Sequence, residues 1–210
     1  MIREYVLASD NPGKLREMAA MFEPLGFIVH PQSDFQVPPG VAETGSTFIE
    51  NALIKARHAA EHTGMACIAD DSGLVVPALQ GAPGIYSARY AGQQADSKAN
   101  MQKLLEALTG VEGEDRSAHF YCAMVCLTSA DDPAPLVATG AWHGHILASP
   151  QGDGGFGYDP VFAVTAIDAP GAQHSAAEIS AAEKARHSHR GQALRKLAEL
   201  VRTGHDGIVT

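Results

Sequence analysis

Apolar residues recur along the chain at strand-like and helix-like spacings in turn, and this alternation predicts an α/β protein. Tyr5–Ala8 is a short apolar run that is typical of a buried strand. Residues at helical spacing follow, up to a glycine well placed to end a helix: Leu15, Met18, Ala19, Phe22, Leu25 and Gly26. Phe27–Val29 then resumes as a strand. A strand, a loop, a helix and a second strand in this order favour α/β architecture.

The rest of the chain continues this alternation. Thr47 and Glu50 have the spacing of a capping box and begin a helix with a small-residue face formed by Ala52, Ala56, Ala59 and Ala60. Strands are expected at Met65–Ala69, Leu74–Val76, Phe120–Cys126 and Leu136–Ile146. Helices are expected at Asp96–Leu108 and Ser188–Arg202, the latter with Leu194, Leu197, Ala198 and Val201 inward, and Ala163–Ala177 is expected to be an extended surface loop. We therefore predict a mixed central sheet flanked by helices, with the chemistry in loops at its edge.

Length and charge narrow the class of protein. The 210 residues contain no linker, low-complexity tract or repeat, so we expect a single domain over residues 1–210. No apolar run reaches the roughly 18 residues of a membrane span, and the first residues lack the layout of a signal peptide, so the expected location is the cytoplasm. The formal net charge of −9 argues against a general nucleic-acid binder. It leaves room for a small polyphosphate bound by a local cluster of donors.

Cysteines and histidines do not indicate a transition-metal site. Cys67, Cys122 and Cys126 stand in apolar surroundings without Cys-x-x-Cys spacing, which favours core positions. His143-Gly144-His145 and His187-Ser188-His189 would each place two rings on one face of a strand. No third ligand stands at a recognisable offset from either pair.

Two adjacent acids interrupt the apolar stretch Cys67–Val76. Asp70 and Asp71, followed by Ser72, are costly in a buried strand unless a metal ion or a reacting group offsets their charge. One or two carboxylates together with substrate phosphates are a common magnesium site, so we interpret the pair as a metal-and-water site. An ordinary Asx turn between two strands is the alternative.

Two other segments carry groups suited to phosphate. Ser9–Lys14 joins a strand to a helix, and free N–H groups at such a helix start favour an anion, although a plain helix start is the alternative. Glu43 precedes the capped helix, on which Asn51 and Lys55 lie one and two turns along the same side. Glu43 could join Asp71 at a cation while Asn51 and Lys55 face phosphate. A solvated helix face is the alternative.

Three later segments add constrained loops, rings and donors. Gly81–Tyr90 is a tight glycine-rich loop, which is either functional or a packed connection. Gly154–Pro160 sets two aromatic rings beside an acid, so a nucleobase could stack on a ring and donate its N–H groups to the acid. An ordinary aromatic turn is the alternative. Lys184 and Ser188-His189-Arg190 bring donors to the start of the last helix, where they could bind an anion or a carbonyl. The alternative is a surface helix start with scattered basic residues.

Taken in order, these segments resemble the Ham1/RdgB family of inosine/xanthosine triphosphate pyrophosphatases. The resemblance rests on collinear strings over nearly the whole chain. They are Ser-x-Asn-x-x-Lys at 9–14, Glu-Thr-Gly-x-Thr-Phe-x-Glu-Asn-Ala at 43–52, Ala-Asp-Asp-Ser-Gly-Leu at 69–74, Gly-Ala-Pro-Gly-Ile-Tyr-Ser-Ala-Arg-Tyr at 81–90, Gly-Gly-Phe-Gly-Tyr-Asp-Pro at 154–160 and Ser-His-Arg at 188–190.

The resemblance implies an ITPase-like fold with the active-site cleft between two lobes. It also implies magnesium-dependent hydrolysis of ITP, dITP and XTP to the monophosphate and pyrophosphate, removing deaminated purines from the nucleotide pool. By position, Asp71 would be the general base and a Mg²⁺ ligand, with Glu43 as the second acid at the metal. The residues implied to bind the nucleoside triphosphate are Ser9, Asp10, Asn11, Pro12, Gly13, Lys14, Asn51, Lys55, Ser72, Phe156, Gly157, Tyr158, Asp159, Lys184, His189 and Arg190.

Selectivity is expected at the purine 6-position, because donors such as His189 and Arg190 would pair with a carbonyl oxygen and oppose the amino group of adenine. Two features depart from common relatives: Ala42 stands where many have a first acid before Glu43, and Thr165–Ser175 is longer and is expected to be surface decoration. Relatives are usually homodimers, so a homodimer is expected. A catalytically silent nucleotide-binding protein and a magnesium-dependent phosphomonoesterase are the alternatives.

Overall fold

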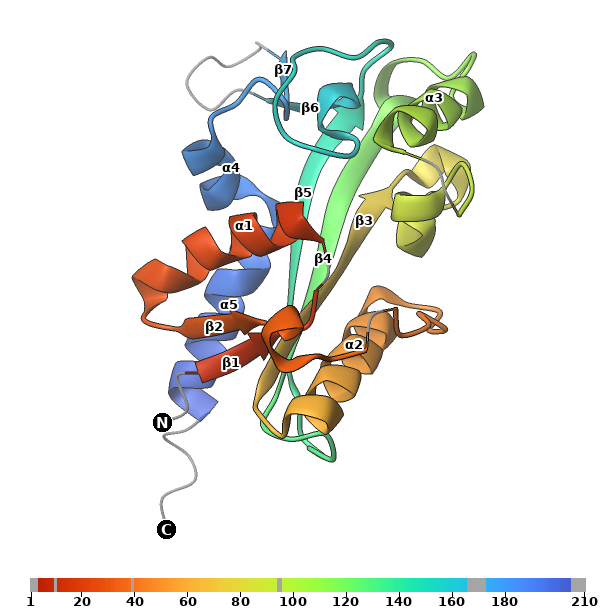
Figure 1. Cartoon of the computed structure of the whole chain (residues 1–210). Coiled ribbons are helices and arrows are strands. Elements are labelled where there is room, and N and C mark those ends of the chain that lie inside the picture. The colour runs from red at the N-terminus through yellow and green to blue at the C-terminus, as the bar shows by residue number, and fades with distance from the viewer. Residues whose placement is uncertain (1–3, 10, 39, 94–95, 166–172, 205–210) are drawn as a thin grey trace. The chain divides into compact units, whose positions relative to one another are not determined.

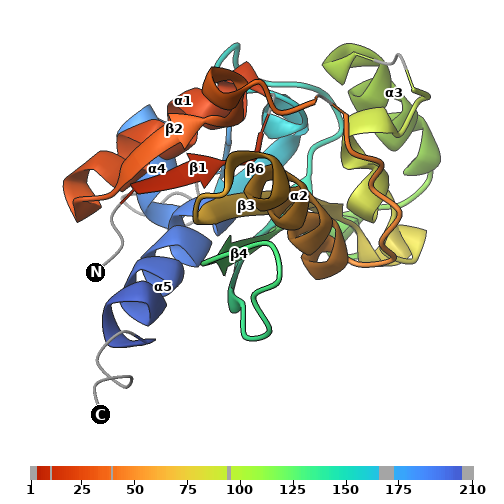
Figure 2. The same ribbon diagram turned by 60° about the horizontal axis from the view of Figure 1, so that its bottom comes forward.

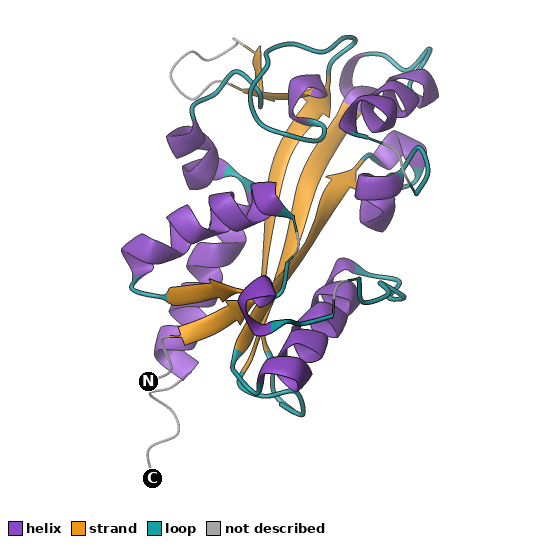
Figure 3. Ribbon diagram, viewed as in Figure 1, coloured by secondary structure: helices purple, strands orange, loops and turns teal. Residues whose placement is uncertain are grey.

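The computed structural model describes residues 4–9, 11–38, 40–93, 96–165 and 173–204, which form both helices and strands (Figures 1 and 3). The strands are β1 (Glu4–Leu7), β2 (Ile28–Pro31), β3 (Cys67–Val75), β4 (Ser117–Leu127), β5 (Leu136–Ile146), β6 (Phe162–Thr165) and β7 (Gln173–Ser175). The α-helices are α1 (Pro12–Phe22), α2 (Phe48–Thr63), α3 (Ser97–Ala107), α4 (Ala181–His187) and α5 (His189–Gly204). Among the 3₁₀ helices, η4 (Gly84–Arg89) and η6 (Asp159–Val161) bear on the site.

Within these ranges the strands form one seven-stranded sheet in the order β2-β1-β3-β4-β5-β6-β7. β1 pairs in parallel with β2 and β3, whereas β6 pairs antiparallel with β5 and β7. The sheet is therefore mixed and carries helices, which confirms the predicted fold class.

The chain forms two compact units, each built from separate stretches of sequence. Unit 1 contains the described residues up to Asp71, Cys122–Gly140 and those from Arg190 onward, and unit 2 contains Ser72–Tyr121 and Ala141–His189. Strands β3, β4 and β5 contribute residues to both units. That residues 1–210 act as one domain stays a prediction.

In unit 1, β1 and the first part of β3 are buried on both faces, because helices pack on each side. In β1, Tyr5 and Leu7 contact α1, α5 and one face of β4, whereas Val6 and Ala8 contact the alanine face of α2. Figures 1 and 2 show α2 on the other side of β1 and β3 from α5. Since side chains of a strand alternate between its two faces, odd and even positions here enter different cores. The predicted alanine face of α2 is confirmed, with each of its four residues at most 3% exposed.

Two details of the predicted elements differ from the structure. The two short strands expected on either side of the acids are one continuous strand, β3, which excludes the Asx turn as an alternative. The helix expected over Ser188–Arg202 is present as α5 (His189–Gly204); a further helix, α4 (Ala181–His187), precedes it, and Ser188 is extended (φ −63°, ψ 160°) between the two. On α5, Ala193 is buried and Ala198 is only half-buried.

The segment Ala163–Ala177, expected to be a surface loop, contains most of β6 and the edge strand β7. Both ends of the segment are buried, because Ala163 and Val164 pack in the core of unit 2 and Ala176 and Ala177 are also covered. Residues 166–172, the middle of the predicted insertion, lie outside the described residues. In the described parts of the chain, no helix combines the length and the apolar character that a membrane span needs.

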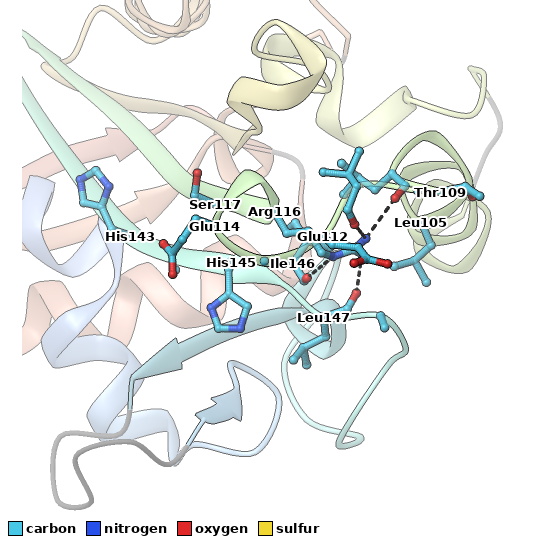
Figure 4. Close-up of a pocket in the computed structure, with 16 residues that line it drawn as sticks. Leu105, Thr109, Glu112, Glu114, Arg116, Ser117, His143, His145, Ile146 and Leu147 are labelled. Atoms are coloured by element: carbon cyan, nitrogen blue, oxygen red, sulfur yellow. Dashed lines mark hydrogen bonds between the residues drawn. The ribbon is translucent and has the colours of Figure 1, made fainter.

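A single arginine ties together the end of β5 and the turn after α3 in unit 2. Arg116 donates to the carbonyl oxygens of Ile146 and Leu147 at 2.7 and 2.9 Å, and to those of Leu108 and Val111 at 3.1 and 3.0 Å (Figure 4). Arg116 and these four acceptor residues are among those that line a pocket of about 980 Å³. Because its guanidinium is used by four backbone acceptors, Arg116 has a structural role.

Candidate active site

The two adjacent aspartates of β3 face opposite sides of the sheet. Asp70 shares the face of Ile68, which packs toward α1 and α5, and Asp71 shares the face of Ala69, which packs toward α2. Their side chains are buried, with Asp70 at 2% and Asp71 at 6% exposure. The two carboxylates therefore have different neighbours, and their interpretation as a metal-and-water site stays a prediction.

Asp70 is held between two cations of unit 1. Its Oδ2 lies 3.1 Å from Lys14 Nζ of α1 and 3.4 Å from Arg190 Nε of α5. Burial by itself would raise the pKa of Asp70, but Lys14 first, then Arg190 and Lys55, outweigh it and hold the pKa far below its usual range. Asp70 is thus the common counter-charge of Lys14 and Arg190, and it connects both helices to the strand.

Asp71 faces a polar cluster supplied by α2 and the loop before it. Lys55 Nζ lies 2.9 Å from Asp71 Oδ1 and 3.1 Å from Glu43 Oε1. Asn51 Nδ2 donates to Asp71 Oδ2 at 3.4 Å. One ammonium therefore serves two carboxylates, and the predicted grouping of Glu43, Asn51, Lys55 and Asp71 is present in the structure.

The protonation of this cluster reflects its burial. Burial outweighs the effect of Lys55 and raises the pKa of Asp71. Burial would lower the pKa of Lys55, but Asp71, Asp70 and Glu43 together raise it. Neighbouring carboxyl groups with pKa values displaced in opposite directions, as in Asp70 and Asp71, are typical of a pair with one charged anchor and one proton acceptor.

The loop before α2 positions this cluster. Thr47 and Glu50 form the predicted capping box, which fixes the first turn of the helix. The Gly45 N–H donates to Asn51 Oδ1 at 2.9 Å, and a Cβ on Gly45 would lie 2.8 Å from that oxygen and 2.6 Å from Glu50 Cβ. Only glycine lets this loop lie against the helix, which explains the Glu-Thr-Gly string.

The segment Ser9–Lys14 starts α1 with its N–H groups already bonded. The Asn11 side chain accepts from the N–H groups of Gly13 and Lys14 at 2.9 and 3.1 Å, and the Asn11 N–H donates to Ser9 Oγ at 3.3 Å. A phosphate would have to displace the Asn11 side chain to reach those donors. Asp10 and the ring of Pro12 lie outside the described residues, so the predicted phosphate loop stays a prediction.

In unit 2, a buried ion pair lies beside an exposed ring. Asp159, 3% exposed, accepts at Oδ2 from Lys184 Nζ at 2.6 Å and from the Phe156 N–H at 2.7 Å. Lys184 Nζ also lies 4.5 Å from the centroid of the Phe156 ring, which is 38% exposed. An acceptor and a stacking surface on one loop thus meet a donor from α4, which brings together the predicted residues Phe156, Asp159 and Lys184.

Other residues predicted to contact the substrate are placed differently. Tyr158 and His189 are buried in unit 2, where Tyr158 donates to the Ser87 carbonyl at 2.9 Å and His189 stacks on Phe120 at 4.9 Å between centroids. Arg190 lies in unit 1 with Asp70, and Ser72 is half-buried at the start of unit 2. Their contact with the substrate stays a prediction.

Glycine substitutions test how tightly the Asp159 loop is built. Gly155 and Gly157 both have positive φ, at 74° and 65°, but a Cβ on Gly155 would overlap the Asp159 carboxylate whereas one on Gly157 meets nothing within 4 Å. We expect Gly157→Ala to lower the free energy of unfolding by about 1 kcal/mol and Gly155→Ala by clearly more. Urea unfolding of both variants measures the difference, and equal losses would show that the loop relaxes around the added methyl group.

A cation at Glu43 and Asp71 would need further ligands. Over the ranges that the structure covers, no group of three or more His, Cys, Asp or Glu could hold a metal ion by itself. Two carboxylates completed by substrate phosphates and water are nevertheless the usual oxygen ligands of Mg²⁺. The donor set fits a cation that binds together with a phosphate substrate.

Comparison with known proteins agrees with this description. The Ham1 family profile matches residues 5–200. A dITP/XTP pyrophosphatase of Thioalkalivibrio sulfidiphilus is 54% identical over 194 residues, covering 92% of this chain and 96% of the relative. A HAM1 protein structure from Coxiella burnetii has a TM-score of 0.85 at 48% identity and covers 96% of this chain and 100% of its own.

A crystal structure described as a nucleoside-triphosphatase and dITP/XTP pyrophosphatase, from Mycobacterium abscessus, has a TM-score of 0.72 at 42% identity. It covers 92% of this chain and 98% of its own. These matches run over nearly the full length of both proteins. The chain belongs to the Ham1 family.

Proposed function

We propose that this protein hydrolyses non-standard purine nucleoside triphosphates, namely ITP, dITP and XTP, to the nucleoside monophosphate and pyrophosphate. The activity is that of the dITP/XTP pyrophosphatases to which the chain is 54% identical. The observation that carries the proposal is the buried cluster of Asp71, Glu43, Asn51 and Lys55, in which one ammonium serves two carboxylates. Such a cluster can bind a metal–phosphate group and hold a water for attack.

The residues of unit 1 are assigned to the phosphates. Glu43 and Asp71 would hold Mg²⁺, and when bound the cation neutralises charge on the phosphate oxygens. Lys55 and Lys14 add positive charge, and Asn51 orients Asp71. Ser9–Lys14, at the start of α1, is proposed to contact the phosphates, with Ser72 as a further contact.

In the hydrolysis step, Asp71 accepts a proton from a water molecule while the water oxygen attacks phosphorus in line with the leaving group. The new P–O bond forms as the bond between the α- and β-phosphates breaks, and pyrophosphate departs. Attack on either of these two phosphorus atoms gives the same products. A buried carboxylate with a raised pKa, held by Lys55 and Asn51, is suited to this role.

The loop of Phe156, Gly157 and Asp159 is assigned to the base, with Lys184 as its donor. Hypoxanthine presents an acceptor at O6 and a donor at N1, which match Lys184 and Asp159, and its ring can stack on Phe156. Adenine presents the reverse pair, a donor at the 6-position and an acceptor at N1. Two mismatched polar contacts predict a kcat/KM for ATP that is lower than that for ITP by about 10²-fold.

A product assay tests the function. The purified protein is incubated with ITP, XTP, GTP or ATP, with and without Mg²⁺, and the monophosphate, pyrophosphate and orthophosphate are resolved. We expect magnesium-dependent IMP and pyrophosphate from ITP, with ATP and GTP largely spared. Orthophosphate as the primary product would indicate a phosphomonoesterase instead, and no turnover would indicate a silent nucleotide-binding protein.

Family resemblance also leads us to propose a cytoplasmic homodimer. Light scattering coupled to size-exclusion chromatography measures the mass directly, against 22.0 kDa for one chain.

A further inference from the structure

The loop Gly81–Tyr90 has no part in the proposed chemistry, yet its centre is tightly bonded inside unit 2. Ser87 is 9% exposed and lies in η4. Its Oγ accepts from the Leu74 N–H of β3 at 2.9 Å and donates to the Gly84 carbonyl at 2.6 Å. Ser87 therefore fastens this loop to β3 two residues beyond Ser72.

The same serine also receives the loop that carries the proposed base site. The Tyr158 hydroxyl donates to the Ser87 carbonyl oxygen at 2.9 Å, and the Tyr158 ring is 5% exposed within the core of unit 2. Burial, and to a lesser extent Tyr90, raises the pKa of Tyr158 well above its usual range, so the hydroxyl remains a donor. Its position immediately before Asp159 makes this bond a tether between the base loop and η4.

Helix α3 holds the other end of η4. Asn100, 4% exposed, accepts from the Ala91 N–H at 2.7 Å and donates to the Ala88 carbonyl at 3.1 Å. Both polar ends of its amide are thus used on the backbone just beyond Ser87. The loop is fixed to β3 on one side and to α3 on the other, so the group that receives Tyr158 has a defined position.

We propose that Tyr158, Ser87 and Asn100 are positioning residues for base selection, acting through the placement of Asp159 and its loop. The bonds of Asp159 to Phe156 and Lys184 fix the carboxylate relative to those two residues. The hydrogen bonds from Tyr158 to Ser87 and from Leu74 to Ser87 fix the loop relative to β3. This inference rests on the proposed role of the Asp159 loop in binding the base. It assigns Tyr158 to support of the site and not to contact with the substrate.

The physical reason lies in how selectivity depends on geometry. A donor and an acceptor distinguish hypoxanthine from adenine only when both are aligned with the edge of the ring, and a shift of about 1 Å can cost about 10²-fold in rate. Removing one hydroxyl from a packed tether leaves the Asp159–Lys184 pair intact but allows its loop to move. The loss should therefore fall on binding and selectivity and leave the hydrolytic step unchanged.

The test compares Tyr158→Phe with Tyr86→Phe, which removes the same hydroxyl from a ring that is 56% exposed in the same η4 helix. For Tyr158→Phe we expect KM for ITP to rise about 10-fold, the ITP-to-ATP ratio of kcat/KM to fall about 10-fold, and kcat for ITP to stay within about twofold. Ser87→Ala should change the same quantities in the same direction. Tyr86→Phe should match the unmodified protein in all of them.

A merely structural role would give a different pattern. Loss of folded enzyme lowers kcat for every substrate equally and leaves KM and the ITP-to-ATP ratio unchanged, and that result, or no change at all, would overturn the proposal.

Calorimetric titration of IMP without metal separates the inference from the proposed hydrolysis. We expect IMP to bind about 10-fold more weakly to Tyr158→Phe than to Tyr86→Phe, whatever the rate of hydrolysis. Equal affinities would overturn the positioning role even if ITP is cleaved as proposed. Absence of IMP binding to the unmodified protein would refute the assigned base site, and the positioning role with it.

Discussion

Replacing Asp71 with asparagine is expected to lower kcat for ITP by roughly 10²–10⁴-fold, the usual contribution of a general base. Asparagine keeps the shape of the side chain but cannot accept the proton of the attacking water. The fold should survive, because a buried neutral amide avoids the desolvation that raises the pKa of Asp71, and Lys55 retains Glu43. Steady-state kinetics with ITP at saturating Mg²⁺ measures the loss.

Asp131→Asn is the matched control for this variant. Asp131 is the exposed member of another adjacent acid pair in unit 1, Asp131-Asp132, so its substitution removes one charge without entering the cluster. It should keep the activity of the unmodified protein. If Asp71→Asn retained turnover within about threefold of that control, the assignment of Asp71 as general base would fail.

Asp70→Asn is expected to lower the stability of the fold strongly, whereas Asp71→Asn is expected to lower mainly the activity. Asp70 is the buried counter-charge of both Lys14 and Arg190, and removing one partner of a buried ion pair leaves an uncompensated charge. We expect the free energy of unfolding to fall by about 3 kcal/mol, against less than about 1 kcal/mol for Asp71→Asn. Denaturant unfolding of the two variants and of Asp131→Asn provides the comparison.

Comparing the stability of Asp70→Asn with that of Asp71→Asn tests the account more strictly than either variant alone. It follows from the alternation of side chains along β3, which directs one acid to α1 and α5 and the next to α2. A midpoint of unfolding for Asp70→Asn no lower than that of Asp71→Asn would contradict the separate roles given to the two side chains.

Periodicity in the sequence predicted most of the architecture. The helical spacing before Gly26, the capping box at Thr47 and Glu50, and the limits of β5 all agree with the structure. These features depend on local preferences and on one apolar face, which a single sequence displays directly. The prediction failed at β3, where two acids interrupt the apolar residues but the strand continues through them. These acids are stabilised by partners distant in the chain, which a single sequence does not show.

The site was predictable by residue type more than by arrangement. Helical spacing places Asn51 and Lys55 on one side of α2, and the structure brings Glu43 and Asp71 to the same side chains. The pairing of Arg190 with Asp70 spans 120 positions along the chain, and no local pattern indicates it.

The buried roles of Tyr158 and Ser87 were likewise not foreseen. Their bond joins positions 71 residues apart, and a tyrosine beside an acid has the same sequence signature whether its ring meets a substrate or a core. The signal that was available is the constrained loop Gly81–Tyr90, whose glycines and proline indicated a packed or functional connection without showing its partner.

The most direct test of the proposed chemistry is the position of the cation in the protein. Crystals grown with Mn²⁺ and a non-hydrolysable ITP analogue would show the metal by its anomalous scattering, since Mn²⁺ shares the oxygen preference of Mg²⁺. We predict a peak within coordination distance of the Asp71 and Glu43 carboxylates, with Asp70 still paired to Lys14 and Arg190. A metal bound to Asp70 instead, or one that contacts neither Asp71 nor Glu43, would contradict the proposed site.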